Sequence, residues 1–351
     1  MQIELRQRGR ASVDFLSALA RVTSREKQAV GREMQGGGFV LDDPAESFAA
    51  RCARFARAIA AAPSFNTFRA LREWSAERHG PIAMEAFDEV RADFAPALDG
   101  LLVGPTTLEA TLGDQVPEYY RGVAFHRTAT WDGHDYMGVV HGEIVHRRIV
   151  ARNFGGDIYQ QRRSALQELR RPSYHDILEL GTSSGNFTVA LSEQFPTARI
   201  TGIDLSLRML QQAQRLGNER GAAWRLLQRA AESTGFPDQS FDLVAAYSFG
   251  HEVPASVFRK ILSEALRILR PGGEFLLGDV IPYSAQDLLT QCWADFDAQN
   301  GGEPFWREFC QLDLAAVAKE QGFATAHYDF ARGPRRFPYV LHAVKADGSG
   351  R

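Results

Sequence analysis

Residues 176–206 read DILELGTSSGNFTVALSEQFPTARITGIDLS, and this stretch decides the fold class. It holds two short apolar runs, Asp176–Gly181 and Arg199–Asp204, on either side of a helical segment of about Phe187–Phe195. The first run ends in glycine and the second in aspartate. Strands that alternate with helices at this spacing predict an α/β fold, in which a parallel sheet is covered by helices on both faces.

The alternation continues toward the C-terminus. We expect a helix from Ser206 to about Gly217, a strand at Phe241–Tyr247, a helix at Ala255–Leu269 and a strand at Glu274–Val280. The turn residues Pro271-Gly272-Gly273 end the second of these helices. The last two apolar segments, Thr325–Phe330 and Pro338–Lys345, are joined by a linker too short for a helical crossover. We therefore expect them to form an antiparallel hairpin at the edge of the sheet.

The first half of the chain has a helical pattern instead. Asp43-Pro44 is typical of an N-cap followed by proline at the first helical position, and an apolar stripe follows it: Phe48, Cys52, Phe55 and Ile59. A second stripe runs through Phe87, Val90, Phe94 and Leu98. Such stripes are expected to pack helix on helix. The sequence thus predicts a mainly helical cap domain over residues 1–160 and an α/β domain over residues 161–351.

Composition narrows the classes of partner and compartment. The 40 Lys and Arg residues against 43 Asp and Glu give a net charge of −3, which disfavours a nucleic-acid partner. The three cysteines, Cys52, Cys292 and Cys310, lie far apart and are expected to be buried or idle thiols. The charged N-terminus leads into no apolar signal region, and no apolar run could span a bilayer. The sequence therefore predicts a soluble cytoplasmic protein with no membrane span.

Candidate ligand-binding residues gather where two of the expected strands end. Gly181 and Gly185 open a turn whose backbone N–H groups can approach a ligand closely. Asp204 ends the next strand, about 20 residues further on, where a carboxylate can accept both hydroxyl hydrogens of a ribose. These two features together predict a nucleoside cofactor and leave its identity open.

Two later stretches, FPDQSFDLVAAYSFGHEVP at Phe236–Pro254 and LSEALRILRPGGEFLLGDV at Leu262–Val280, complete a set of ordered motifs. With them the chain resembles the class I S-adenosylmethionine-dependent methyltransferases, in particular the branch with quinone and sterol methyltransferases, from Asp176 to about Lys345. The resemblance implies a Rossmann-like seven-stranded sheet, S-adenosylmethionine as cofactor and S-adenosylhomocysteine as product. This cofactor has no phosphate, so two glycines in the loop suffice where a pyrophosphate-binding loop usually has three.

The resemblance also implies roles for individual residues. Glu179 would reach the methionine ammonium, and Asp204 would bind the ribose. The other implied cofactor contacts are Gly181, Thr182, Ser183 and Gly185 along the methionine, Leu205 and Met209 on the adenine, and Tyr247 and Ser248 beside the sulfonium. The chain departs from the family twice. Ser183 replaces a usual glycine, which is tolerated if its φ stays negative, and Ala230 replaces an adenine-binding aspartate, for which Ala231 or Glu232 could substitute.

The methyl acceptor is expected beyond the strand ends. His251 follows a strand and could act as a base on the acceptor, or merely pack the loop. The segment Pro117–Arg148 is rich in histidines and aromatic residues, with His134 and His141 as further catalytic candidates and His126 and His146 beside them. The expected lining of the acceptor pocket is Tyr120, Trp131, Phe305 and Trp306. No metal is expected, because His141 and His146 are five apart and one face of an α-helix needs three or four.

These observations favour methyl transfer to an O or C nucleophile of a small, partly aromatic or hydrophobic metabolite, in a biosynthetic pathway. Two alternatives stay open: an S-adenosylmethionine-binding enzyme that runs a non-methylating reaction, and a non-enzymatic binding module. An uncovered apolar face over Phe87–Leu98 would favour the module. The expected partner is a small-molecule acceptor, and a homodimer is left open.

Overall fold

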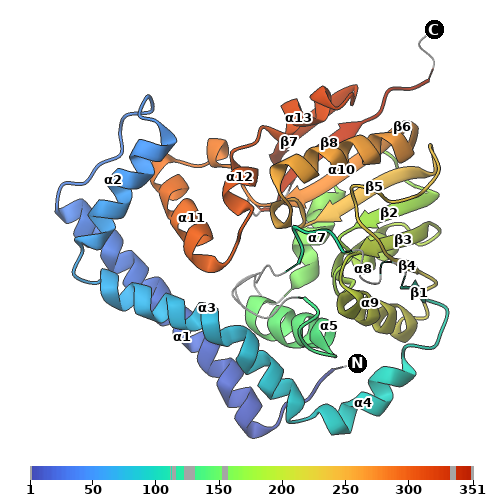
Figure 1. The fold of residues 1–351 in the computed structure, drawn as a ribbon, viewed down its shortest axis with the longest axis horizontal. Coiled ribbons are helices and arrows are strands. Elements are labelled where there is room, and N and C mark those ends of the chain that lie inside the picture. The colour runs from blue at the N-terminus through green and yellow to red at the C-terminus, as the bar shows by residue number, and fades with distance from the viewer. Residues whose placement is uncertain are drawn as a thin grey trace.

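The computed structural model describes residues 2–110, 112, 116–121, 131–151, 157–332 and 337–348. Its centre is an eight-stranded sheet in the order β1-β4-β3-β2-β5-β6-β8-β7 (Figure 1). The strands are β1 (Thr107–Glu109), β2 (Asp176–Leu180), β3 (Arg199–Asp204), β4 (Arg225–Gln228), β5 (Phe241–Tyr247), β6 (Leu269–Asp279), β7 (Thr325–Phe330) and β8 (Tyr339–Val344).

The strand pairing confirms the predicted α/β architecture. Strands β1 to β6 pair in parallel, whereas β8 pairs antiparallel with both β6 and β7. The expected C-terminal hairpin is therefore present, with β7 as the outer strand. All five residues of β2 are buried, as expected for a central strand with both faces covered, whereas β7 alternates between exposed and half-buried residues.

Helices cover both faces of this sheet. One face is covered by α7 (Ile158–Leu166), α8 (Asn186–Gln194) and α9 (Leu207–Glu219), and the other by α10 (Ala255–Ile268) and α13 (Leu314–Glu320). Ser206 caps α9, because its hydroxyl oxygen accepts the Met209 N–H. The helices predicted in this half are present with ends shifted by one or two residues, and β6 already begins at Leu269.

Two strands were not predicted from the sequence. β4 contains only four residues, too few for a periodic signal to stand out. β1 lies in the helical half of the chain and extends the sheet beyond β4, with Thr107 paired to Arg225. The seven strands implied by the resemblance are thus joined by an eighth, short edge strand.

The N-terminal half forms an arm of helices beside the sheet (Figure 1). It consists of α1 (Gln7–Gly36), α2 (Phe48–Ala60), α3 (Phe65–Asp88) and α4 (Arg91–Gly100). The arm includes a helix from the other half of the chain: α11 (Leu288–Gly301) packs against α2 and α3 and buries Cys292 among their apolar side chains. Asp297 of α11 also pairs with Lys27 and Arg72, at 2.6 and 3.0 Å.

Two details of the helical half differ from the prediction. Asp43-Pro44 lies in a turn rather than at a helix start, and the N-cap of α2 is Ser47, whose hydroxyl oxygen accepts the Ala50 N–H. The stripe from Phe87 to Leu98 is not one helix, because the chain breaks between α3 and α4. Phe87, Val90 and Leu98 are nevertheless buried in a shared core.

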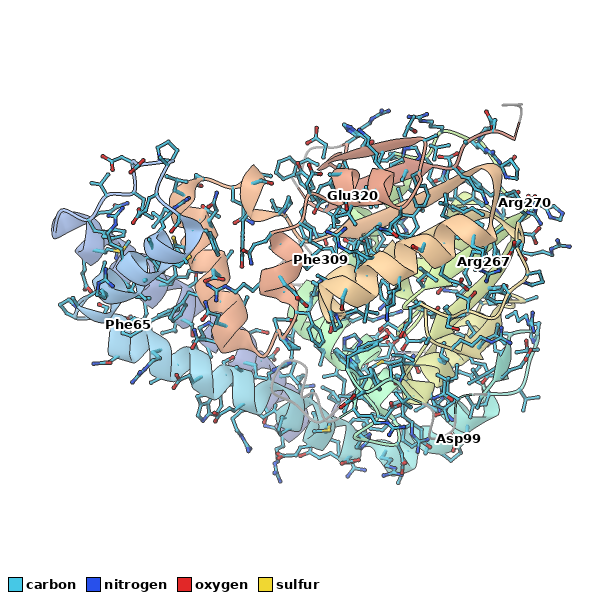
Figure 2. All side chains as sticks on the ribbon, turned by 45° about the horizontal axis from the view of Figure 1, so that its top comes forward. Phe65, Asp99, Arg267, Arg270, Phe309 and Glu320 are labelled. Carbon is cyan, nitrogen blue, oxygen red and sulfur yellow. The ribbon has the colours of Figure 1, made fainter. Side chains whose placement is uncertain are left out.

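Polar contacts join the α4 end of the arm to the sheet domain. Arg215 of α9 donates to the Leu98 carbonyl and pairs with Asp99, which also accepts the Tyr136 hydroxyl. Asp99 and Phe65, labelled in Figure 2, mark opposite ends of this helical half. Within the described ranges, no helix combines the length and the apolar character that crossing a bilayer requires.

Candidate functional site: a cofactor pocket at the strand ends

A cavity of about 490 Å³ opens where β2, β3 and β5 end. This is the edge of an open parallel sheet at which ligands bind. The residues that line it come from both halves of the chain: Tyr119, Tyr120, Trp131, His141, His146, Val150, Arg162, Gly181, Ser183, Ile203, Asp204, Leu205, Met209, Arg229, Ala231, Tyr247, Ser248, Phe249, His251, Glu252, Val253, Val280, Glu303, Trp306 and Phe337.

The floor of the cavity is the turn that follows β2. Gly181 has φ +65°, and a Cβ there would lie 2.4 Å from the Phe249 ring, so only glycine fits. Ser183 has φ +50°, which corrects the expectation that its φ stays negative. Its backbone N–H donates to Asp204 at 2.8 Å, and this charge-assisted bond offsets part of the cost of the left-handed conformation.

Asp204 is fixed at the end of β3 by both of its oxygens. Oδ2 accepts the Ser183 N–H and Oδ1 accepts the Ser206 N–H, each at 2.8 Å. Burial raises the pKa of Asp204 to about 6, although these amide bonds act in the opposite direction. The carboxylate lines the cavity, where its remaining lone pairs can accept two adjacent hydroxyl groups.

The opposite end of the cavity contains a histidine–aspartate pair. His251, which is 6% exposed, lies 2.5 Å through Nδ1 from Asp279 at the end of β6. Asp279 also accepts the Gly250 and Val280 N–H groups, so it is held in place. Burial would lower the pKa of His251, but the carboxylates of Asp279, Glu252 and Glu303 outweigh burial and raise it to about 10. Trp306 packs edge-on against the imidazole, with ring centroids 4.8 Å apart.

Comparison with known proteins identifies the domain that holds this cavity. Residues 177–273 match the family described as "Methyltransferase domain". The chain carries a class I methyltransferase domain. S-adenosylmethionine is the cofactor of this class, and the cavity is lined by Gly181, Ser183 and Asp204, three of the residues that the resemblance implies as cofactor contacts.

Relatives with assigned names match only part of the chain. A demethylmenaquinone methyltransferase from Thermus thermophilus is 34% identical over 37% of this chain and 58% of that protein. A fatty-acid O-methyltransferase from Mycolicibacterium smegmatis is 35% identical over 30% of this chain and 37% of that protein. The solved phosphoethanolamine N-methyltransferase 2 of Haemonchus contortus, with S-adenosyl-L-methionine, is 16% identical with a TM-score of 0.42, over 54% of this chain and 53% of that one. The chain spans about half the length of the curated relatives it matches.

Two ionisable side chains, Glu179 and Arg162, lie near the part of the cavity where the resemblance implies that the methionine binds. Glu179 is 1% exposed, accepts the Thr188 hydroxyl at 2.5 Å and does not itself line the cavity. Burial raises the pKa of Glu179 to about 8, while the nearby Arg162 acts to lower it. Because Glu179 lies behind the residues that line the cavity, it would reach the methionine ammonium of the cofactor either between these residues or through a water molecule.

Arg162 of α7 lines the cavity, and the sequence analysis missed it. Its guanidinium stacks 4.7 Å from the Tyr247 ring centroid, and Nη1 donates to the Ile158 carbonyl at 2.5 Å. Nε is buried and has no hydrogen-bond partner among the described residues. Burial lowers the pKa of Arg162. A guanidinium in this position can bind a carboxylate, which is the group that the cofactor carries beside its ammonium.

The adenine end of the methyltransferase site lacks the usual aspartate at Ala230. Ala231 lines the cavity, as do Leu205 and Met209. The Glu232 carboxylate instead accepts the Tyr119 hydroxyl at 3.0 Å, which joins the segment after β4 to the roof of the cavity. Of the two candidate substitutes for the missing aspartate, Ala231 is therefore the one that lines the cavity.

A π-helix, η2 (Val140–Val150), brings two histidines of the N-terminal half together. In a π-helix the hydrogen bonds join residues five apart, so His141 and His146 lie on the same side, with ring centroids 4.2 Å apart. We expected no metal at His141 and His146 because they lie five residues apart on an α-helix; the segment is a π-helix, so that reason is wrong. Both line the cavity, and Trp131 packs edge-on against His141 at 5.0 Å.

The remaining predicted residues lie at or near the cavity. Tyr120 lines it and donates to Asp132, while Thr182 donates to the Ile203 carbonyl beneath the loop and Gly185 is the N-cap of α8. Among the candidates for catalysis and for the acceptor pocket, two do not line the cavity. His134 bonds Asp88 at 3.1 Å against the helical core, and Phe305 precedes α12 (Trp306–Cys310), where Trp306 alone lines the cavity. His126 lies outside the described residues.

In the part of the chain that the structure describes, one group of side chains has donor atoms close enough to hold a metal. These are His251, Glu252 and Glu303, whose donor atoms all lie within 4.8 Å of one another. Metal binding requires a deprotonated imidazole. His251 pairs with Glu252 at 3.6 Å and with Asp279 at 2.5 Å, and these carboxylates raise its pKa, so we assign this group to charge pairing.

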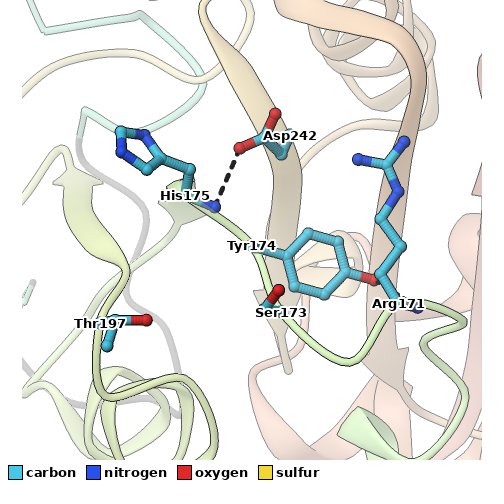
Figure 3. A pocket seen from close by; sticks show the side chains of 6 residues that line it. All are labelled: Arg171, Ser173, Tyr174, His175, Thr197 and Asp242. Carbon is cyan, nitrogen blue, oxygen red and sulfur yellow. Dashed lines mark hydrogen bonds between the residues drawn. The ribbon is translucent and has the colours of Figure 1, made fainter.

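A second hollow lies at the opposite end of the strands and is not a candidate site (Figure 3). It is lined by Arg171, Ser173, Tyr174, His175, Thr197 and Asp242. Asp242 accepts the backbone N–H groups of His175 and Asp176 and pairs with Arg270, so its carboxylate is used in joining the starts of β2, β5 and β6.

Proposed function

We propose that the protein transfers the methyl group of S-adenosylmethionine to an oxygen or carbon nucleophile of a small, partly aromatic or hydrophobic metabolite. One observation carries the proposal: a single cavity joins the cofactor residues, Ser183 and Asp204, to a buried histidine flanked by aromatic rings. A methyl donor and a nucleophile have to meet in line at about 3–3.5 Å, away from water. One cavity lined by both sets of residues supports such a meeting.

His251 is proposed to take the proton of the acceptor. Asp279 occupies Nδ1 at 2.5 Å, whereas Nε2 lies 3.6 Å from a Glu252 carboxylate oxygen, so Nε2 is the ring nitrogen proposed to meet the acceptor. When bound, S-adenosylmethionine supplies an electrophilic methyl on a sulfonium. That positive charge disfavours the protonated form of a nearby imidazole, which makes His251 a better base in the presence of the cofactor. The nucleophile then forms its bond to the methyl carbon as the carbon–sulfur bond breaks.

The aromatic side chains around the cavity favour an acceptor with an apolar body. Trp306, Phe249 and Phe337 line the cavity together with Tyr119 and Trp131. Such rings exclude water and pack well against flat or aliphatic groups. Two relatives carry the names of a quinone and a fatty-acid methyltransferase, which is compatible with an acceptor of this kind.

Two other functions receive less support. A non-enzymatic binding module would have an uncovered apolar face over Phe87–Leu98. Phe87, Val90 and Leu98 are buried instead, which disfavours this alternative. A non-methylating reaction of bound S-adenosylmethionine uses the same cavity and is separated from methyl transfer only by its products.

The test is a reaction of the purified protein with S-adenosylmethionine and a panel of acceptors: phenols, hydroquinones, fatty acids and acyl thioesters. We expect S-adenosylhomocysteine to form together with an acceptor heavier by one methylene unit. The variant His251→Ala should lose turnover and still bind S-adenosylhomocysteine in calorimetry. Consumption of the cofactor without a methylated acceptor would favour the non-methylating enzyme, and failure to bind either form of the cofactor would overturn the proposal.

A further inference from the structure

Two of the three cysteines, which lie 240 residues apart in sequence, meet between the helical arm and α11. The Sγ atoms of Cys52 in α2 and Cys292 in α11 are 3.9 Å apart, and both are free thiols. Cys292 is buried, whereas Cys52 is half-buried and can be reached from solvent. A disulfide has an S–S length of about 2.04 Å, so the two sulfur atoms need to approach by about 1.9 Å.

The surroundings hold these two helices in register. Arg51, next to Cys52, donates to the Gln291 side chain, next to Cys292, at 2.9 Å. Arg51 is itself 6% exposed, so this contact is part of the packed interface. The thiol of Cys52 hydrogen-bonds to Cys292 and, despite burial, lowers the pKa of Cys292, with help from the Arg51 guanidinium. The same contact raises the pKa of Cys52, so the thiolate form is favoured at Cys292 relative to its partner, and a thiolate is what thiol–disulfide exchange requires.

We propose that Cys52 and Cys292 are a disulfide-forming site that, when oxidised, clamps α2 of the helical arm to α11 and slows the exchange of ligand in the pocket. With a small disulfide such as oxidised glutathione, one cysteine thiolate attacks the S–S bond and releases glutathione. The second thiolate then attacks the mixed disulfide and releases another glutathione. Two thiols are oxidised, one disulfide is reduced, and the two thiol protons leave with the products.

The clamp would act on the pocket through the chain that follows α11. This chain carries Glu303 and Trp306, both of which line the pocket. The α2 end is tied to the same region, because Phe48 stacks on Tyr283 at 4.8 Å and the Arg307 guanidinium lies over the Phe48 ring. A bond between α2 and α11 thus restrains the pocket wall that carries Glu303 and Trp306.

Cys310 provides an internal control. It is buried in α12, its Sγ lies 3.8 Å from the Ile281 carbonyl, and burial raises its pKa. The variant Cys310→Ser leaves the Cys52–Cys292 pair intact, whereas Cys52→Ser removes it. Both changes preserve the size of the side chain, and circular dichroism checks that each variant is folded.

The experiment treats the full-length reduced protein with oxidised glutathione and maps its disulfides by mass spectrometry without reduction. We expect a Cys52–Cys292 peptide in the wild type and in Cys310→Ser, and an increase in the thermal midpoint that is reversed by dithiothreitol. Stable glutathione adducts in place of the internal linkage would overturn the site.

The gating part has a separate readout. The release rate of S-adenosylhomocysteine is measured by stopped-flow displacement. Oxidation should lower this rate several-fold in Cys310→Ser and leave it unchanged in Cys52→Ser. Equal release rates from oxidised and reduced Cys310→Ser, with the linkage present, would refute the gate. Disulfide mapping needs no ligand, so its outcome is independent of the proposed methyl transfer.

Discussion

Cofactor binding is predicted to release a proton from Glu179. Burial raises the pKa of this carboxyl to about 8 in the unliganded protein, so at pH 7 about 0.9 of the molecules hold it protonated. The ammonium of S-adenosylhomocysteine favours the carboxylate and lowers that pKa on binding. Because the folded, unliganded pKa lies above the working pH, binding should expel about 0.9 proton at pH 7 and about half a proton at pH 8. Asp204, with a pKa of about 6, adds only about 0.1 proton at pH 7.

The assay is isothermal titration calorimetry at pH 7 in buffers that differ in ionisation enthalpy, such as phosphate and Tris. The slope of binding enthalpy against buffer enthalpy gives the number of protons released. Glu179→Gln keeps the size of the side chain and cannot ionise, so its slope should fall to about 0.1 and its affinity by about 1.5–3 kcal/mol. 5′-Methylthioadenosine, which lacks the amino-acid group, should give the low slope with the wild type. A slope near zero for S-adenosylhomocysteine, or an equal slope in Glu179→Gln, would refute the role of Glu179.

Three further predictions concern the two ends of the pocket. Asp204→Ala should weaken the binding of S-adenosylhomocysteine by about 3 kcal/mol or more in calorimetry, since the two charge-assisted bonds expected from the ribose hydroxyls to Asp204 are lost. Near-normal affinity would remove Asp204 from the ribose site. If neutral His251 is the base, kcat/KM for the acceptor should rise with pH toward the His251 pKa of about 10, and Asp279→Asn should move that rise to lower pH by about 1–3 units; a pH-independent profile from 7 to 10 would argue against it. Arg162→Met should weaken S-adenosylhomocysteine by about 1.5–3 kcal/mol and leave 5′-methylthioadenosine unaffected in the same titrations, whereas an equal loss for both ligands would indicate a structural role.

The parts of the domain that were predictable from sequence are those governed by local rules. The turn at Gly181 requires a residue without a side chain, and Asp204 follows a short apolar run directly, so both are visible within a few residues of sequence. The helix after Ser206 was also predictable, because its N-cap residue directly precedes its apolar residues in sequence. Each of these features depends on neighbours in sequence rather than on packing between distant segments.

The parts that were missed depend on contacts between distant segments. Arg162 and Arg163 are adjacent in one helix, yet Arg162 faces the cavity and Arg163 pairs with Glu193 at the surface. Asp279 supports a histidine 28 residues earlier in the chain, and nothing around it in sequence indicates that partner. The helix α11 was not predicted from the sequence. Nothing near its apolar residues in sequence indicates that they pack in the N-terminal arm rather than on the sheet.

Most of the unusual backbone conformations lie at the cavity, and this agreement supports the assignment of the pocket. Among the described non-glycine residues with positive φ, Ser183 and Ser248 at +50° line the cavity, whereas Gln239 at +56° lies in a turn before β5. The π-helix that sets His141 against His146 is a rare geometry, and both histidines line the same cavity. A backbone departs from its preferred conformations where the surrounding structure holds it, and such departures are expected at binding sites. The backbone conformation and the arrangement of side chains are separate observations, and both point to the strand ends as the place where this protein works.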